Sequence, residues 1–182
     1  TAIFRSSSQD GRTIWKSDGT TAGTQVVKEF SGEDDVEAEF SMAQAKGFTF
    51  FPENDGEHGF ELWKSDGTEN GTVLVKDIST EGNYQGIASS FPRQLTAVND
   101  NVFFVANAGY QDDGYVGDSL WKTDGTSAGT VMVKDLISGE GDPQFANFTS
   151  LNGRLFFTAY DDIHGRGLWK SDGTPAGTQL VK

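Results

Sequence analysis

Carboxylates and glycines gather in four short stretches of this sequence, each ending just before a tryptophan. The stretches read SSSQDGR, PENDGEHGFE, NAGYQDDGYVGDS and YDDIHGRG. Oxygen-rich segments with glycine turns suit Ca²⁺, which takes roughly six to eight oxygen ligands in flexible geometry. Solvated turn acids are the alternative, because no D-x-[DN]-x-[DN]-G loop is present. The candidate Ca²⁺ ligands are Asp55, Asp112, Asp113, Asp118, Asp161 and Asp162.

Two histidines occupy equal places in two of these stretches. His58 and His164 each lie five residues before a tryptophan. Equal places indicate a structural hydrogen bond that the two residues make in the same way. A shared transition-metal site is not expected, because a whole unit of the chain separates the two side chains.

Aromatic residues offer a second kind of site. The third repeat unit is 10 residues longer than its neighbours, with five extra residues in each of two loops. An aromatic ring on an inserted loop can stack on a sugar or anchor a protein partner. Such a ring can equally cover a gap in the scaffold. The same two roles are open to Phe91, which also lies near an insertion. The candidate ligand-binding residues are Tyr84, Tyr110 and Tyr115.

Catalysis requires groups that converge in one pocket. The sequence does not show which carboxylates from different loops lie close together in the fold. No phosphate-binding loop, nucleophile elbow or zinc signature occurs. No catalytic residue is therefore named, and we expect a protein that is not an enzyme. A polysaccharide hydrolase would need two carboxylates about 5–10 Å apart in one cleft.

An internal repeat provides the elements that position these stretches. Four tryptophans recur at spacings of 48, 58 and 48 residues, and each begins the pattern W-K-[ST]-D-G-T-x-x-G-T-x-x-V-K. Runs such as FTFFPEN before each stretch and TVLVKDI after each motif predict strands. Each unit is thus predicted to form four antiparallel strands, A to D. Such units of about 40–50 residues are typical of β-propeller blades.

The repeated motif is interpreted as structural. Its Asp-Gly step forms the tight turn from strand C to strand D, with the carboxylate accepting backbone N–H groups. The tryptophan fills the space between blades, the second glycine lets the chain turn back, and the lysines keep outer strands charged against edge-to-edge pairing. Structural roles are assigned to Trp15, Trp63, Trp121, Trp169, Asp18, Asp66, Asp124 and Asp172.

The repeats occupy approximately residues 1–30, 31–78, 79–137 and 138–182 of a single repeat domain, 1–182. The first lacks its innermost strand A, so the sequence predicts 15 strands. Either the chain is a piece of a longer array, or two or more chains associate to complete a ring. Its first residue is Thr rather than Met, which favours a processed or excised segment.

Charge and composition exclude several classes of partner. The chain has 14 basic and 27 acidic side chains and a formal net charge of −13. An acidic surface repels nucleic acids and anionic lipids, so neither partner is expected. The absence of cysteine excludes disulfides and thiolate metal sites. No apolar run approaches the roughly 18 residues of a membrane helix, so membrane insertion is not expected.

The second unit, ELWKSDGT at Glu61–Thr68, resembles a repeat family of large secreted bacterial proteins named for its ELW-x-x-DGT signature. The other units replace this glutamate with Thr13, Ser119 or Gly167. GTVLVKDI at Gly71–Ile78 is also similar to the family pattern. The resemblance covers essentially the whole chain and implies repeat architecture, a bacterial source and export to the cell surface or medium. It implies no catalytic residues.

Together these observations predict an all-β, propeller-type protein that acts as a non-catalytic extracellular binding or assembly scaffold. Its ligand would be a glycan or a protein at the loop face, with no required cofactor and Ca²⁺ as the one candidate ion. Two alternatives are kept. One is a structural subunit of a bacterial surface layer or filament, and the other is a propeller polysaccharide hydrolase or lyase.

Overall fold

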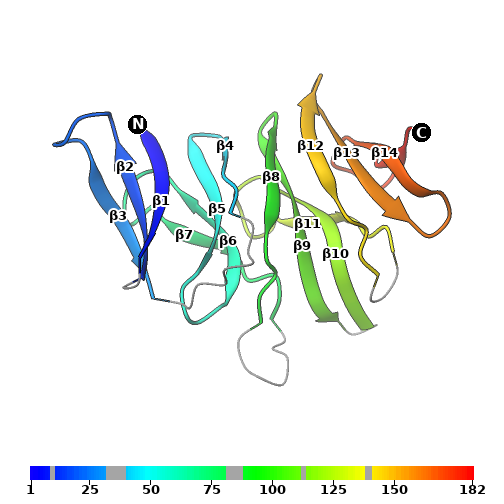
Figure 1. Cartoon of the computed structure of the whole chain (residues 1–182), viewed down its shortest axis with the longest axis horizontal. Helices are drawn as coiled ribbons and strands as arrows, with labels where there is room; N and C mark the ends of the chain where they lie inside the picture. Colours follow the sequence, from blue (N-terminus) through cyan, green and yellow to red (C-terminus); the bar gives the residue numbers. More distant parts are fainter. Residues whose placement is uncertain (9–10, 32–39, 81–87, 112–113, 138–140) are drawn as a thin grey trace.

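The computed structural model shows an all-β chain, with 15 strands among the residues that it describes. It describes residues 1–8, 11–31, 40–80, 88–111, 114–137 and 141–182. Within these residues there is no helix long and apolar enough to cross a membrane. The strands form four antiparallel sheets that follow one another along the chain, from the N-terminus at one end of the molecule to the C-terminus at the other (Figure 1).

The first sheet has three strands, in the order β1 (Ala2–Ser8), β2 (Gly11–Ser17) and β3 (Gln25–Phe30). The second runs β4 (Ala43–Ala45), β5 (Phe48–Asn54), β6 (Phe60–Ser65) and β7 (Val73–Lys76). The third runs β8 (Arg93–Val98), β9 (Asn101–Gln111), β10 (Gly114–Thr123) and β11 (Val131–Lys134). The fourth runs β12 (Ala146–Leu151), β13 (Arg154–Asp161), β14 (Gly165–Ser171) and β15 (Gln179–Leu180).

This arrangement confirms the predicted propeller-type array of four units, of which the first lacks strand A. Each sheet lies inside one of the four predicted repeats. Because the strands of a sheet alternate in direction, the A–B and C–D turns lie at one end of each sheet. The B–C turns and the D–A connections lie at the other end.

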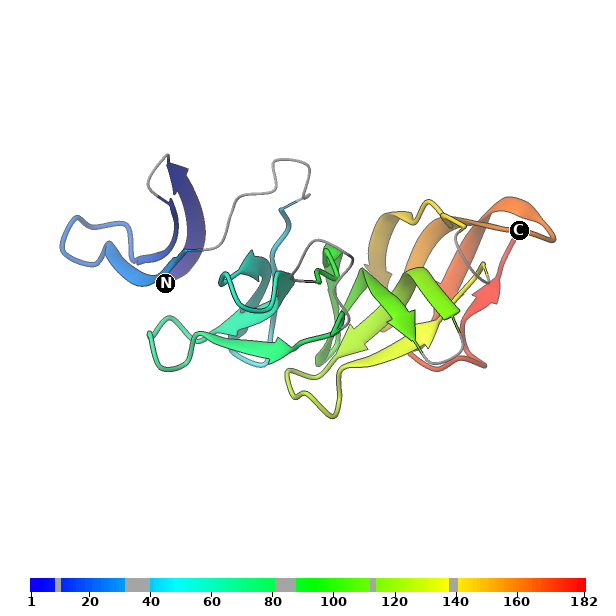
Figure 2. The same cartoon turned by 90° about the horizontal axis from the view of Figure 1, so that it is seen from below.

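The sheets follow one another from the N-terminal to the C-terminal end of the molecule in the second view as well (Figure 2). Among the described residues, the hydrophobic core lies between the sheets in three clusters. Neighbouring residues of a strand point to opposite faces, so an inner strand buries both faces and becomes continuously apolar. Phe51 packs towards the first sheet with Ile14 and Trp63, whereas Phe50 packs towards the third with Phe104 and Trp121. This two-sided burial explains the Phe-Phe pairs of strand B.

The C–D turns have one hydrogen-bond plan in all four units. In the second unit, Asp66 Oδ1 accepts the backbone N–H of Thr68 at 2.8 Å and its hydroxyl at 2.7 Å. The Thr68 hydroxyl oxygen in turn accepts the N–H of Gly71 at 3.0 Å. The Thr68 hydroxyl bond is the main reason that the pKa of Asp66 lies below its usual value. Gly67 takes a φ of 87°, which favours glycine.

The second glycine of the motif has a different task from the predicted one. None of these four glycines has a positive φ. A Cβ atom at Gly71 would instead lie 2.1 Å from Asp66 Oδ1, and the other units repeat this contact at 1.9–2.1 Å. The aspartate carboxylate thus fills the space that any larger residue would need. The members are Gly23, Gly71, Gly129 and Gly177.

The repeated lysines also differ from the prediction that they protect strand edges. Lys64 Nζ donates to the carbonyl of Gly125 in the next unit at 2.7 Å, and Lys16 reaches Gly67 in the same way at 3.1 Å. Lys76 Nζ donates to Thr130 O at 3.0 Å and lies 5.9 Å above the Trp121 ring. These lysines therefore connect each sheet to the following one.

Candidate functional site

The B–C turn of the second unit, between β5 and β6, brings together three titratable side chains. Asp55, Glu57 and His58 each place one ligand-type atom within 4.8 Å of the others. A sharp turn allows this, because Gly56 and Gly59, on either side of Glu57 and His58, adopt φ values of 86° and 71°. We refer to Asp55, Glu57 and His58 as the turn cluster.

The geometry of the turn cluster orients the imidazole. Asp55 Oδ1 accepts the backbone N–H groups of Glu57 and His58 at 2.9 and 2.8 Å. Asp55 Oδ2 lies 2.8 Å from His58 Nδ1, and the histidine side chain is 36% exposed. Since Nδ1 is occupied by the carboxylate, Nε2 is the nitrogen left to exchange protons with a ligand or solvent.

Electrostatics at the pair favour charge on both groups. The hydrogen bond to Asp55 raises the pKa of His58 above its usual value, and the negative charges of Asp55, Asp77 and Glu57 act in the same direction. Partial burial alone would raise the pKa of Asp55. The hydrogen bonds from His58 and Glu57 together outweigh that effect and lower it.

The fourth unit repeats the pair without the third member. His164 Nδ1 lies 2.8 Å from Asp161 Oδ2, and Asp161 Oδ1 accepts the N–H groups of Ile163 and His164. This is the hydrogen bond that the equal places of the two histidines predict. Ile163, which is 85% exposed, stands where the second unit has Glu57. The fourth unit is therefore a natural control for the turn cluster.

Two arginines of the first unit form ion pairs with a buried glutamate that lies just before the turn cluster in the chain. Glu53, fully buried, accepts from Arg12 Nε at 2.5 Å, and Arg5 Nε lies 3.2 Å from its other oxygen. Arg12 Nη2 also donates to the carbonyl of Asn54 at 2.7 Å, one residue before Asp55. Burial raises the pKa of Glu53, against the opposing effect of both arginines.

Glu61, the glutamate of the ELW triplet, supports the same end of the sheet. Its carboxylate accepts the backbone N–H groups of Ile78, Ser79 and Ser90 and the hydroxyl of Ser90. It thereby holds both ends of the D–A connection to the third unit. Burial raises its pKa to about 7, although these donors act in the opposite direction. From the sequence, Glu61 was noted only as part of the ELW-x-x-DGT signature, and this hydrogen-bonding role was not predicted.

The four candidate Ca²⁺ ligands that the structure describes do not form one site. They belong to three different units, and the other two candidates, Asp112 and Asp113, lie outside the described residues. Both oxygens of Asp118 accept from the Arg93 guanidinium. Asp161 is engaged by His164, and Asp162 is exposed. The turn cluster offers two carboxylates and an imidazole, a set that does not fit the many oxygens Ca²⁺ requires.

The aromatic residues of the B–C insertion lie on strands rather than on the predicted loop. The insertion lengthens β9 and β10 to 11 and 10 residues, and the backbone of Tyr110 pairs with that of Tyr115 across this hairpin. Tyr84 lies outside the described residues. Phe91 stacks on Phe60 with a centroid distance of 5.9 Å, so this ring covers the scaffold.

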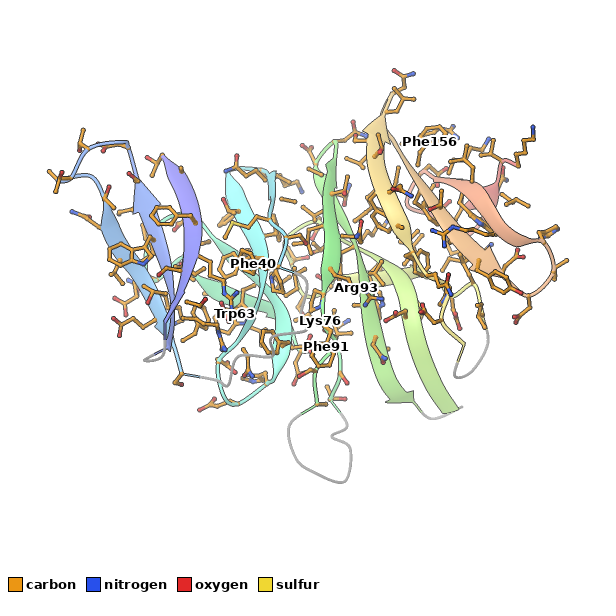
Figure 3. All side chains as sticks on the ribbon, viewed as in Figure 1. Phe40, Trp63, Lys76, Phe91, Arg93 and Phe156 are labelled. Carbon is orange, nitrogen blue, oxygen red and sulfur yellow. The ribbon has the colours of Figure 1, made fainter. Side chains whose placement is uncertain are left out.

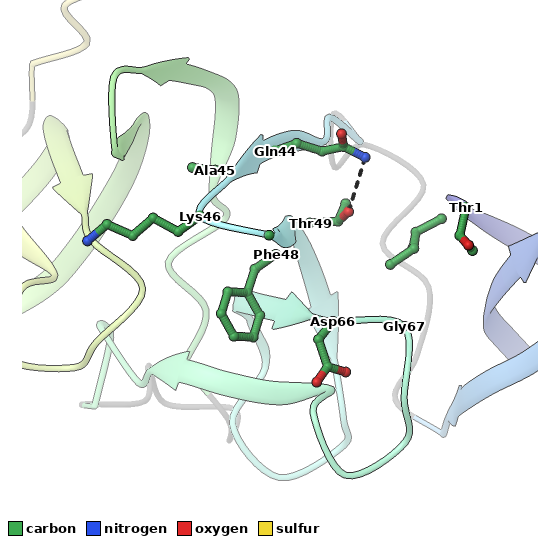
Figure 4. Close-up of a pocket in the computed structure, with 10 residues that line it drawn as sticks. Thr1, Gln44, Ala45, Lys46, Phe48, Thr49, Asp66 and Gly67 are labelled. Carbon is green, nitrogen blue, oxygen red and sulfur yellow. Dashed lines mark hydrogen bonds between the residues drawn. The ribbon is translucent and has the colours of Figure 1, made fainter.

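A pocket of about 380 Å³ opens at the opposite end of the second sheet (Figure 4). It lies between the first and second units, where the A–B turn at Lys46 meets the C–D turn at Asp66. Its one carboxylate, that of Asp66, is engaged in the turn described above. The pocket therefore has no acid–base pair, and it lies away from the turn cluster.

Comparisons with known proteins show the fold. No family model matches the chain, so the ELW-x-x-DGT resemblance stays a prediction. No curated protein matches it either. Solved structures of puromycin hydrolase, one of them a mutant complexed with PGG, match 98% of the chain at TM-scores of 0.59 and 0.58. Their identities are 13% and 12%, and the chain spans about a quarter of their length, 26%.

These neighbours correct the expected function. The absence of catalytic motifs led to the expectation of a non-catalytic binding or assembly scaffold, and that expectation is wrong, because the similar structures belong to an enzyme. The propeller hydrolase alternative agrees better with them. Export, Ca²⁺ and carbohydrate binding stay predictions. The chain is thus similar in fold to the puromycin hydrolase structures over nearly its whole length.

Proposed function

We propose that this chain is a propeller portion of a hydrolase and that the turn cluster takes part in proton transfer. The observation that carries the proposal is the convergence of Asp55, Glu57 and His58 within 4.8 Å on one turn. An imidazole oriented by a carboxylate is a common general acid–base group. The fold shared with a protein named puromycin hydrolase supports the same reaction class.

In this proposal neutral His58 removes a proton from a water molecule as that water attacks the scissile carbon. The water oxygen forms the new bond, the bond to the leaving group breaks, and His58 returns the proton to the leaving group. Asp55 holds the imidazole by Nδ1 and stabilises the transient imidazolium. Glu57 adds a second negative charge that favours the imidazolium.

The substrate class follows from the chemistry of the pair. A histidine base suits hydrolysis of an acyl bond, such as an amide, because the carbonyl carbon accepts water directly. A glycosidic bond would instead need two carboxyls about 5–10 Å apart on either side of the sugar. Carboxylate atoms of Asp55 and Glu57 lie within 4.8 Å of each other on one turn, so we favour an acyl substrate over a polysaccharide.

The test is hydrolysis by the purified chain of two substrate panels, aminoacyl amides including puromycin and polysaccharides. We expect turnover of an amide, reduced about 10²-fold or more by His58→Gln. The matched variant His164→Gln changes the same side chain in the unit without the glutamate and should retain activity.

The pH dependence gives a second readout. Because a base must be neutral and the pKa of His58 is raised above 6.5, kcat/KM should increase as pH rises through values above 6.5. Equal losses in the two histidine variants, or no turnover above buffer on either panel, would overturn the proposal. Turnover of polysaccharide alone would overturn the acyl assignment.

A further inference from the structure

Phe91 differs from every other described residue that has an unusual backbone conformation. Seven non-glycine residues of the described chain have a positive φ, and six of them are Asn, Gln or Lys. The seventh is Phe91, with a φ of 47°. A bulky side chain is an outlier in this region, and such residues cluster at active sites and ligand clamps. The fold thus keeps an aromatic ring at a position that disfavours one.

The fourth unit shows that this backbone path does not require an aromatic ring. Gln144 holds the equivalent place there and has a φ of 49°. In both units the preceding residue accepts a backbone N–H from strand B, at 2.8 and 2.7 Å. Because a glutamine adopts the same path, the course of the chain alone does not explain the ring of Phe91.

Phe91 lies beside the strand that leaves the turn cluster. Its backbone N–H donates to the Phe60 carbonyl at 3.1 Å. Gly59 permits this close approach, because a Cβ atom there would lie 2.0 Å from the Ala88 carbonyl oxygen. Since His58 and Phe60 are two residues apart, their Cα atoms are separated by at most about 7 Å. Phe91 accordingly lies towards the end of the sheets that carries the B–C turns (Figure 3).

The Phe91 ring rests on a buried ring and is itself partly open to solvent. It stacks on Phe60 with an interplanar angle of 19° and is 37% exposed. Phe60 is buried, and the Arg12 guanidinium lies 5.3 Å from the centre of its ring. Arg12 is in turn ion-paired with Glu53. The supporting ring is therefore fixed before a ligand binds, which lowers the entropic cost of stacking on Phe91.

The charges and the chemistry of this region limit the ligand. The carboxylates of Asp55, Glu57 and Asp77 all act on His58 as negative charges, and the whole chain has a net charge of −13. An anionic substrate would be repelled. The Phe91 side chain offers no hydrogen bond, so it selects an apolar group. An aromatic group gains most, because offset stacking adds to the burial of apolar area.

We propose that Phe91 determines the substrate specificity of the turn cluster by stacking on an aromatic side chain of the substrate. This inference rests on the proposed function, for which it names a substrate class, amides of aromatic amino acids without a negative charge. Stacking and burial favour such an amide over that of alanine by about 10-fold or more. Phe91 contacts the substrate and moves no proton, so KM should depend on this residue more than kcat.

Binding is tested without turnover, in the whole chain carrying His58→Gln. Isothermal titration calorimetry compares phenylalanine amide with alanine amide, which differ only in the ring. We expect phenylalanine amide to bind about 10-fold more tightly or better, and the added substitution Phe91→Gln to remove this difference. Glutamine is compatible with this φ at position 144, so the variant should fold, which circular dichroism checks.

Two further variants serve as controls. Phe91→Tyr keeps an aromatic ring and should keep the preference for phenylalanine amide. Gln144→Ala changes the equivalent position in the fourth unit and should also keep it. A role of Phe91 in the scaffold alone would instead leave the preference unchanged in Phe91→Gln.

Turnover of the two matching p-nitroanilides by the chain with His58 intact gives a second readout. Phe91→Gln should raise KM for the phenylalanine substrate about 10-fold, with little change in kcat. The same variant should leave KM for the alanine substrate unchanged, because that substrate has no ring to stack.

Three results would overturn the inference: equal binding of the two amides, a preference that survives Phe91→Gln, and a preference that Gln144→Ala removes as well. The outcome for the proposed function is separate. A binding preference that depends on Phe91, without turnover of either nitroanilide, supports the aromatic contact and contradicts the hydrolase. Turnover with the same substrate ratio in the wild type and Phe91→Gln does the reverse.

Discussion

At the scale of single residues, the side chains of the repeated motif hydrogen-bond to one another and to the backbone of the same turn. Asp66 Oδ1 binds Thr68 twice, the Thr68 hydroxyl binds Gly71, and the Ser65 and Thr72 hydroxyls lie 2.7 Å apart beneath the turn. Every position therefore depends on the others, which explains why four copies keep the same residues. Two residues allow sharp tests.

The first test concerns Gly71. A Cβ atom there would overlap the Asp66 carboxylate, so Gly71→Ala must break the turn or move the aspartate. We expect the free energy of unfolding to fall by at least about 2 kcal/mol. Chemical denaturation measures it, with Asn70→Ala at the exposed neighbouring position as the control. A loss equal to that of the control would contradict the proposed role of the carboxylate.

The second test concerns the pH dependence of Glu61. Its pKa of about 7 in the folded chain exceeds the ordinary value of 4.5, so the folded state holds a proton that the unfolded state releases. The stabilising effect is therefore complete below about pH 4.5 and disappears as pH rises through 7.

We expect the stability difference between wild type and Glu61→Gln to fall by on the order of 1–3 kcal/mol from pH 5 to pH 8. Urea denaturation at several pH values measures the difference. Glu69→Gln, at an exposed position, should show no comparable trend. A difference that grows with pH would mean that the hydrogen-bonded carboxylate is favoured over the carboxylic acid.

At the scale of elements, the lysines connect sheets that have no paired strands in common among the described residues. Lys64 and Lys76 extend from β6 and β7 to the third unit. Their equivalents in the fourth unit, Lys170 and Lys182, make no hydrogen bond through Nζ in the part of the chain that the structure describes. The same substitution can therefore be made at a lysine that has this hydrogen bond and at one that lacks it.

Lys64→Met should lower the free energy of unfolding by about 1 kcal/mol, because the Gly125 carbonyl loses a charged donor and the methionine keeps the apolar stem. Lys170→Met should leave it unchanged, because Lys170 Nζ makes no hydrogen bond among the described residues. Thermal and chemical denaturation compare the two variants. Equal effects would show that the lysines act through their own sheet rather than through the next.

At the scale of the whole molecule, the array is one-dimensional, and each unit packs only on its neighbours in the chain. Within the described residues, the second and third units each pack on two neighbours, and the first and fourth each pack on one.

The repeat, the strands and the chemistry of the C–D turn could all be predicted from the sequence. These are local properties: a tight Asp-Gly turn and alternating apolar runs act within a few residues, and four copies make the pattern unmistakable. The missing strand A of the first unit followed from the same alignment. For these features the structure added distances and one reason, since the second glycine makes room for a carboxylate rather than allowing a positive φ.

Contacts between units could be identified only once the sheets were placed in space. That Arg12 neutralises Glu53 across 41 residues, and that Lys76 reaches Thr130 across 54, depends on how sheets stack, which no local pattern encodes. The same stacking keeps three of the predicted Ca²⁺ ligands, Asp55, Asp118 and Asp161, in three different units. Identical residues thus acquire different roles because burial and partners are set by neighbours far away in the chain.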